Sequence, residues 1–175
     1  MTLSEILFRR RSVRKFTDRK VDRQTIDTIL KAALTAPSSK NTRSTRFMVV
    51  DKPEMLDQIS QMRDYGSALV KNAPLAVIVL GDTALTDLWV DNCAISATIL
   101  QLAAEEQGLG SCWVHVNDRP RKKDEPGMGT ATEYLRTVLP IPTSWNPLCV
   151  VAIGYADDYP APHAAHDDSD KILFM

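Results

Sequence analysis

The 175-residue sequence predicts an α+β fold with a mixed, mainly antiparallel sheet of four to five strands flanked by helices. Three observations favour this class. Short apolar runs of strand length are interspersed with helical patterns, but their spacing does not repeat as regular βαβ units. No GxGxxG follows a predicted strand and no Walker loop is present, so a Rossmann or P-loop nucleotide fold is not indicated. The composition, 44% hydrophobic and 25% charged, fits a single domain over residues 1–175.

Local signals along the chain define the helices. Thr2 and Glu5 have the spacing of a capping box, so a helix should begin there and stop near the arginines that follow. Asp22 is a good N-cap for the second helix, and Pro37 should end it. Gly108 should close the long fourth helix. The later helical segments are residues 21–37, 53–62, 88–110 and 130–139.

The strands are predicted from apolar runs. Residues 74–82 form an uninterrupted apolar run, which is typical of a strand buried on both faces. The helical segment 88–110 is apolar around most of its circumference, so we expect it at the centre of a core or across a subunit interface. The four predicted strands are residues 46–50, 74–82, 111–116 and 148–156.

Charge and cysteine content restrict the function classes. The net charge is -1, which argues against a protein that binds nucleic acid through a broad basic face. Cys93, Cys112 and Cys149 are scattered through apolar runs, which suggests reduced, buried thiols and a cytoplasmic location. The N-terminus is too polar for a signal peptide, and no apolar run approaches the roughly 20 residues that would span a bilayer, so no membrane partner is expected.

Five of the nine residues from Phe8 to Phe16 are basic, and this range is called the basic segment below. Arg10 and Arg14 lie four residues apart with Ser12 between them. Two guanidinium groups and a hydroxyl suit a phosphate monoester. Charged runs are nevertheless most often solvated surface, so the basic segment by itself leaves both interpretations open.

A polar loop, residues 36–47, follows the second helix. It presents Ser38, Ser39 and Asn41 before the chain enters a strand. Short hydroxyl and amide side chains at such a position can bind the polar edge of a ligand, or they can simply form a turn. The loop alone does not decide between the two.

Four motifs in order resemble the FMN-dependent nitroreductase family over essentially the whole chain. They are RRSVRKF (10–16), APSSKN (36–41), GLGSCWV (108–114) and VVAIGY (150–155). The resemblance implies a nitroreductase-like homodimer with FMN at the subunit interface. It implies an oxidoreductase that passes a hydride from NAD(P)H to an electron-poor acceptor, such as a nitroaromatic or quinone, by a ping-pong mechanism. The sequence offers no nucleophile or acid–base dyad, and this chemistry requires none.

The resemblance also implies a set of FMN contacts. The phosphate, ribityl chain and pyrimidine edge would be held by the basic segment, and a partner subunit would add the polar loop. The strand after Gly110 would run beside the isoalloxazine ring, with a backbone N–H facing flavin N5. A basic residue of the tail would approach the phosphate, Lys171 being a better match than His163 or His166. The implied contacts are Arg10, Arg11, Ser12, Arg14, Pro37, Ser38, Asn41, Trp113, His115, Val116 and Lys171.

The sequence departs from the family pattern at two places. Arg43-Ser44-Thr45 stands where the family commonly has Gln-Pro-Trp, and His115 stands where Gly or Gln is frequent. Both changes bear on substrate scope. Two other functions stay open: a non-catalytic flavin-binding or flavin-sensing protein, and another flavin chemistry, such as reductive dehalogenation, on the same fold.

Two further segments have open roles. Residues 117–129 form a charged loop that would border the substrate entrance as a lid or be a surface insertion without a role. The tail, residues 157–175, is polar up to Ile172 and could wrap the partner subunit. His163, His166, Asp167 and Asp168 lie in this tail, but they lack the apolar shell of a metal site, so no metal is expected.

Overall fold

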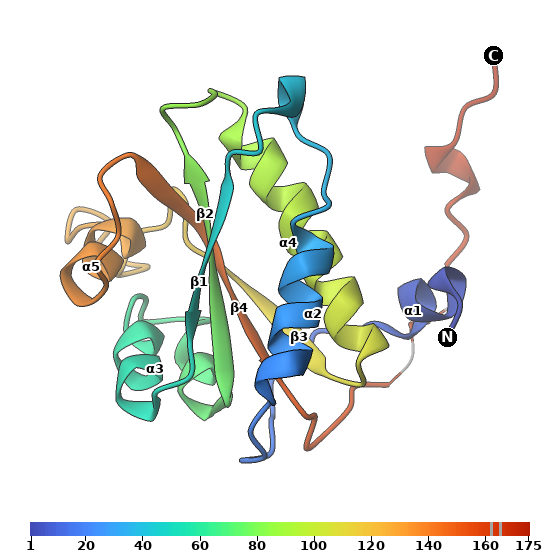
Figure 1. The fold of residues 1–175 in the computed structure, drawn as a ribbon, viewed down its shortest axis with the longest axis horizontal. Helices are drawn as coiled ribbons and strands as arrows, with labels where there is room; N and C mark the ends of the chain where they lie inside the picture. The colour runs from blue at the N-terminus through green and yellow to red at the C-terminus, as the bar shows by residue number, and fades with distance from the viewer. Residues whose placement is uncertain (162, 165) are drawn as a thin grey trace.

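The computed structural model describes residues 1–161, 163–164 and 166–175, and it has the expected α+β architecture (Figure 1). One four-stranded sheet has the order β1-β2-β4-β3, and every neighbouring pair is antiparallel. The prediction of a mainly antiparallel sheet is therefore confirmed. The strands are β1 (Thr45–Val50), β2 (Leu75–Asp82), β3 (Gly110–His115) and β4 (Trp145–Gly154).

The helices begin where the capping signals place them. The Thr2 and Glu5 capping box is formed, and the Asp22 carboxylate accepts the Thr25 N–H at 2.9 Å. The second helix ends earlier than predicted, at Ala33 rather than at Pro37. The helices are α1 (Leu3–Arg9), α2 (Arg23–Ala33), α3 (Pro53–Ser60), α4 (Trp89–Glu106) and α5 (Ala131–Val138), with 3₁₀ turns η1 (Ser39–Asn41), η2 (Ala68–Asn72) and η3 (Ser169–Lys171).

Strand β4 begins at Trp145, three residues before the predicted start. Pro147 lies inside this strand, although proline has no N–H to donate to a neighbouring strand. A register shift between Val79 and Leu80 of β2 accommodates it, because Val79 pairs with Cys149 and Leu80 pairs with Pro147. Residues 145–147 join the strand through this irregularity, which adds them to the predicted range of 148–156.

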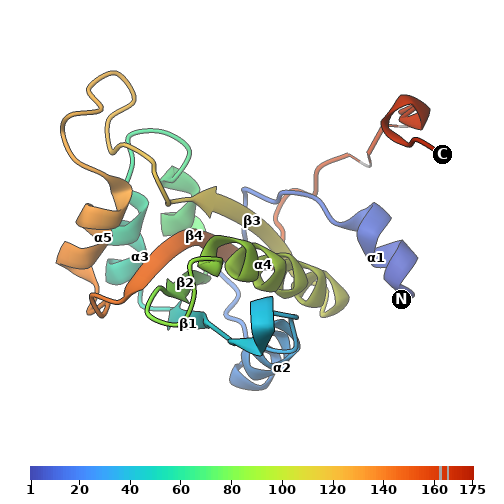
Figure 2. The ribbon, with the colours of Figure 1, turned by 90° about the horizontal axis from the view of Figure 1, so that it is seen from above.

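The two faces of the sheet carry separate hydrophobic clusters (Figure 2). Val77 of β2 belongs to the cluster that α2 and α4 cover, whereas Ile78 belongs to the cluster under α3 and α5. Residues 75–80 are fully buried, as their uninterrupted apolar run predicts. The sheet is therefore covered by helices on both faces.

Helix α4 packs across one face of the sheet, as expected for a helix so apolar. Its first turn lies on β2, where a Cβ atom on Gly81 would stand 2.4 Å from the Trp89 ring. Gly108 follows the helix with a φ of +73°, the left-handed conformation predicted for its end. Leu88, Val90 and Ile95 nevertheless stay exposed, which leaves an apolar surface at the first half of the helix.

Helix α1 and the C-terminal segment lie on the same side of the molecule, away from most of the sheet (Figures 1 and 2). The last four residues are apolar and project into solvent, and Phe174 is 95% exposed. None of the helices in the described part of the chain has the length and apolar content needed to cross a membrane.

Candidate functional site

The basic segment lies along the outer edge of β3. The Val13 N–H donates to the Ser111 carbonyl at 3.0 Å, and Ser12 forms a parallel bridge with Ser111. The close approach requires Gly110, because a Cβ atom there would stand 2.6 Å from the Val13 side chain. Val13 is fully buried whereas Arg14 is exposed, so the extended backbone turns its apolar side chain inward and its polar side chains outward.

Arg10 and Arg14 lie two residues before and after Ser12, whose bridge to Ser111 holds their backbone beside the start of β3. Burial raises the pKa of the Cys112 thiol, and the charges of Arg14 and Arg10 oppose that rise. Arg14 donates to the Ser12 carbonyl at 3.2 Å. Within the described residues, neither the Arg10 guanidinium nor the Ser12 hydroxyl has a hydrogen-bond partner. These donors are therefore available to an anion.

The C-terminal tail contacts the basic segment through His163. Its Nδ1 lies 2.6 Å from the Arg11 guanidinium, and its Nε2 lies 3.2 Å from the Arg10 carbonyl. A guanidinium can only donate and a carbonyl can only accept, so this arrangement requires a neutral imidazole with its proton on Nε2. Lys171, the better sequence candidate, instead pairs with Asp168. The structure thus brings His163 to the arginines.

Two side chains that the sequence did not single out, Glu105 and Tyr159, hold the basic segment in place through Arg9. Glu105 of α4 is only 2% exposed, and its carboxylate pairs with Arg9 at 2.9 Å and accepts the Tyr159 hydroxyl. This cluster, called the Glu105 latch below, ties α1 and the start of the tail to the end of α4. A signal was present in the sequence: Glu105 follows Ala104 on the buried face of an apolar helix, where a carboxylate needs a partner.

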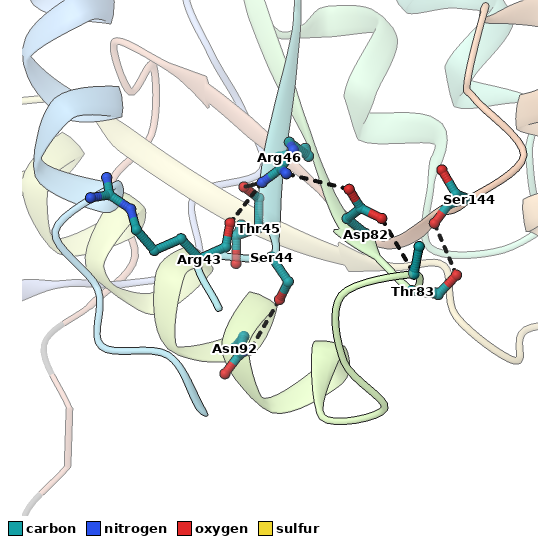
Figure 3. A network of polar contacts seen from close by, with 9 residues as sticks. Arg43, Ser44, Thr45, Arg46, Asp82, Thr83, Asn92 and Ser144 are labelled. Carbon is teal, nitrogen blue, oxygen red and sulfur yellow. Dashed lines mark hydrogen bonds and ion pairs between the residues drawn. The ribbon is translucent and has the colours of Figure 1, made fainter. Parts of the chain in front are cut away.

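The part of the polar loop that precedes β1, residues 36–44, is held at the opposite end of α4 (Figures 1 and 3). Asn92 is 2% exposed, its Oδ1 accepts the Ser39 N–H at 2.9 Å, and its Nδ2 donates to Ser44 and Thr42. Around Asn41 the backbone is strained, since three non-glycine residues have a positive φ: Lys40 (49°), Asn41 (54°) and Arg43 (47°). Strain of this kind persists only where surrounding contacts enforce it, and it gathers at functional sites.

The two sets of predicted FMN contacts do not meet within one chain. Asn92, which holds the polar loop, and Glu105, which holds the basic segment, lie about 20 Å apart along the axis of α4. The residues predicted from the partner, Pro37, Ser38 and Asn41, are thus remote from Arg10, Ser12 and Arg14 of the same chain. Helix α4 separates the two sets.

Strand β3 carries the remaining predicted residues toward its end. The Trp113 indole N–H donates to Nδ1 of His115 at 3.2 Å, and the two rings stack with centroids 6.2 Å apart. Burial, followed by the charges of Arg119 and Arg63, lowers the pKa of His115. Neutral His115 therefore keeps its proton on Nε2, with Nδ1 as the acceptor.

Val116 is the predicted residue least able to reach a ligand. Its side chain is fully buried, and its N–H already donates to the Leu148 carbonyl at 3.0 Å. The Asn117 N–H donates to the same carbonyl. The backbone N–H groups of Val116 and Asn117 are therefore both committed within the protein.

The charged loop, residues 117–129, leaves β3 beside His115. Its position is fixed on the C-terminal side of α3, because the Asp64 N–H donates to the Arg121 carbonyl at 2.9 Å. The Arg121 guanidinium lies 4.1 Å from the Tyr134 ring centroid and donates to the Gln61 carbonyl. Arg121 thus supports the loop, and its exposed cations are Arg119, Lys122 and Lys123.

No group of three or more His, Cys, Asp or Glu side chains in the described part of the chain is arranged to hold a metal ion. The predicted tail residues instead make local contacts. Asp167 accepts the Ser169 N–H at 3.1 Å, and Asp168 pairs with Lys171.

Comparisons with known proteins identify the family of the chain. Residues 7–65 and 56–155 match the profile of the nitroreductase family. A Methanothermobacter thermautotrophicus protein, provisionally named NADH dehydrogenase/NAD(P)H nitroreductase, is 35% identical over 175 residues, which cover 98% of this chain and 86% of that protein. The solved structure of an FMN-dependent nitroreductase from Clostridium difficile R20291 is 39% identical, has a TM-score of 0.91 and matches over 98% of both chains.

A second solved structure, from Bacteroides thetaiotaomicron VPI-5482, carries the same provisional name as the Methanothermobacter protein. It is 30% identical with a TM-score of 0.87, over 98% of this chain and 96% of that one. These matches span both the basic segment and the polar loop, the two regions that the geometry singles out. The chain therefore belongs to the nitroreductase family.

Proposed function

We propose that this protein is an FMN-dependent oxidoreductase that passes a hydride from NAD(P)H to an electron-poor acceptor, such as a nitroaromatic or a quinone, in two half-reactions. One observation carries the proposal. The basic segment is fixed on the edge of β3 by Gly110 and Val13, and it presents donors that the described residues leave uncommitted. The similar Clostridium difficile protein is named as FMN-dependent, and the Methanothermobacter relative as an NAD(P)H nitroreductase.

The side chains at this edge fit FMN. Arg10 and Ser12 would hold the phosphate and the ribityl chain, and Arg14 would lie at the pyrimidine edge, where its charge favours the reduced, anionic ring. When bound, FMN supplies a site that accepts a hydride and releases it to a second substrate. The protein supplies orientation and charge.

The other half of the site would come from a second copy of the chain. Pro37, Ser38 and Asn41 lie at the far end of α4 from the basic segment, so a pair of chains related by a two-fold axis would bring each loop to its partner's arginines. The exposed apolar side chains Leu88 and Ile95 support a homodimer that buries α4. Each chain would be a single domain over residues 1–175, with the tail from residue 157 wrapping its partner.

The ring end of the site would be formed by Trp113 and His115. Both are half-buried on one face of β3, and the neutral imidazole keeps an Nε2–H that can donate to an acceptor. The exposed cations Lys122 and Lys123 lie on the following loop, where they can attract the phosphates of NAD(P)H. The free, buried thiols Cys93, Cys112 and Cys149 support a reducing, cytoplasmic location.

Flavin titration and anaerobic reduction test the proposal. The purified protein should be yellow or take up FMN stoichiometrically, and NADH or NADPH should bleach it within seconds in the absence of oxygen. Arg14→Ala should weaken FMN binding about ten- to a hundredfold, because one charge-assisted contact is lost from an exposed position. A colourless protein that takes up no FMN contradicts the proposal, and FMN that resists bleaching identifies a flavin-binding protein without reductase activity.

The dimer has its own test. Sedimentation equilibrium should give twice the chain mass, and deletion of residues 160–175 should weaken the dimer and release FMN together. A stable monomer that keeps FMN contradicts the two-chain site.

A further inference from the structure

A hollow of 370 Å³ lies between α2, the polar loop and β1, and it is called the α2 hollow below. Its walls are apolar, formed by Leu30 of α2, by Leu34 directly after this helix and by Phe47 of β1. Ser38, Ser96 and Arg43 also line it, and the Ser96 hydroxyl donates to the Thr45 hydroxyl at 3.2 Å. An apolar pocket of this size with a few polar groups at one side is the usual form of a small-molecule site.

Arg43 is the uncommitted cation of the α2 hollow. Figure 3 shows its side chain turned away from the neighbouring polar network and toward α2. Within the described residues, its guanidinium makes no hydrogen bond or ion pair. Arg46, the second cation of the hollow, already pairs with Asp82 at 3.3 Å and donates to the Arg43 carbonyl at 2.7 Å. Arg43 therefore has its full donor capacity free.

The backbone holds Arg43 in this position at a conformational cost. Its φ is +47°, a conformation that non-glycine residues seldom adopt. The Arg43 N–H donates to the Ser38 hydroxyl at 2.9 Å, and Arg46 binds its carbonyl, so both backbone groups are fixed. An exposed arginine without a partner does not need such restraint for stability. Strain that directs an uncommitted side chain indicates a binding role.

The chemistry of the α2 hollow selects its ligand. A planar guanidinium matches a carboxylate, to which it can donate two parallel hydrogen bonds, and the adjacent Ser38 hydroxyl accepts the Arg43 N–H and can still donate its own proton. The apolar walls match a hydrocarbon body of the size of one aromatic ring. No carboxylate is among the described residues that line the hollow, so nothing there repels an anion. We propose that the α2 hollow binds a small aromatic carboxylate, with Arg43 as the residue that selects the acid group.

Ligand titration monitored by NMR tests the proposal, and it does not depend on flavin. Phenylacetate is the probe, and phenylacetamide is its neutral isostere. Phenylacetate should shift the amide signals of Ala36, Phe47 and Ser96 in a saturable manner and bind about tenfold or more tightly than the amide. Arg43→Gln should abolish this preference, whereas Lys31→Gln, which removes an exposed charge of α2 outside the hollow, should leave it intact.

Further variants show whether phenylacetate or the apolar end of the tail occupies the α2 hollow. Ala36→Phe, which adds a ring to the wall of the hollow and leaves residue 43 an arginine, should abolish the shifts. Equal affinity of Arg43→Gln and the parent protein for phenylacetate overturns the proposal. It is also overturned if phenylacetate shifts only the amide signals of Arg10 and Arg14. If deletion of residues 172–175 shifts the amide signals of Ala36, Phe47 and Ser96 in the absence of phenylacetate, the apolar end of the tail occupies the hollow, and the proposal is wrong.

Discussion

Each end of α4 holds a neighbouring segment of the chain through a buried polar side chain, but one of these side chains is neutral and the other is a carboxylate. Each end buries one polar side chain, Asn92 or Glu105, and each of these is 2% exposed. Asn92 is neutral and holds the polar loop through three hydrogen bonds. Glu105 is a carboxylate and holds the basic segment and the tail through Arg9 and Tyr159.

The difference follows from what each end must hold. The polar loop has backbone strain, and an amide that both donates and accepts can satisfy its N–H and hydroxyl groups together. The basic segment has a high density of positive charge, so a buried carboxylate offsets it. The Asn92 end should therefore be insensitive to pH and salt, whereas the Glu105 end should respond to both.

Removal of the buried carboxylate should have the largest effect. Glu105→Ala leaves Arg9 without its ion pair and Tyr159 without its acceptor, and we expect a loss of about 3 kcal/mol in the free energy of unfolding. Urea denaturation measures this. The matched control is Glu106→Ala, which removes an exposed carboxylate one residue later and should cost less than about 0.5 kcal/mol. Equal losses in the two variants would show that the latch does not stabilise the fold.

Removal of the buried Asn92 amide should lower the free energy of unfolding by less, and its local effect should be confined to the polar loop. Asn92→Ala should lower the free energy of unfolding by about 2 kcal/mol, because hydrogen bonds are lost from a neutral group. Hydrogen exchange should increase at Ser39, whose N–H loses its acceptor. Asn92→Asp keeps that acceptor and is the control, so it should retain protection at Ser39. Faster exchange in the basic segment of Asn92→Ala would mean that the two ends are coupled.

The tyrosine of the Glu105 latch should show the pH response. Burial, followed by the neighbouring Glu105, raises the pKa of Tyr159 to about 12 from its ordinary value of 10.0. Because the folded pKa is the higher one, the contribution to stability is complete below pH 10 and is lost as the pH rises through about 12.

Tyr159→Phe tests this contribution. This variant should lose about 1 kcal/mol in the free energy of unfolding at neutral pH, and the difference in stability from the parent protein should vanish in strong alkali. Absorbance of the phenolate gives the titration, and unfolding at several pH values gives the stability. A constant difference across this range would show that Tyr159 acts through packing alone.

The smallest effect concerns His115, which belongs to neither end. Its pKa is lowered from 6.5, chiefly by burial, so its contribution to stability is present above that pH and declines as the pH falls. NMR titration should place its midpoint below 6.5 in the folded protein and at the ordinary value in urea. Protonation should also shift the Trp113 indole N–H signal, because Nδ1 ceases to be an acceptor. An unmoved indole signal would show that the two rings are not coupled.

Much of the fold could be predicted from local patterns. The caps at Thr2 and Asp22, the apolar run of β2 and the glycine after α4 each depend on residues close in the chain. The start of β4 was predicted too late, because Pro147 is tolerated only through an irregularity in the neighbouring strand. For the site, motif resemblance indicated the basic segment and the polar loop, but it also selected Val116, whose N–H is committed to Leu148.

The sequence by itself determined which segments become helices and strands, which faces are buried and which residues carry positive charge. Those properties depend on near neighbours and on hydrophobic periodicity. Only the tertiary structure decided that Glu105 meets Arg9 and Tyr159, that Asn92 holds the polar loop and that Arg43 faces an apolar hollow. Such pairs join residues from distant elements, and their geometry is set by how α4 packs on the sheet.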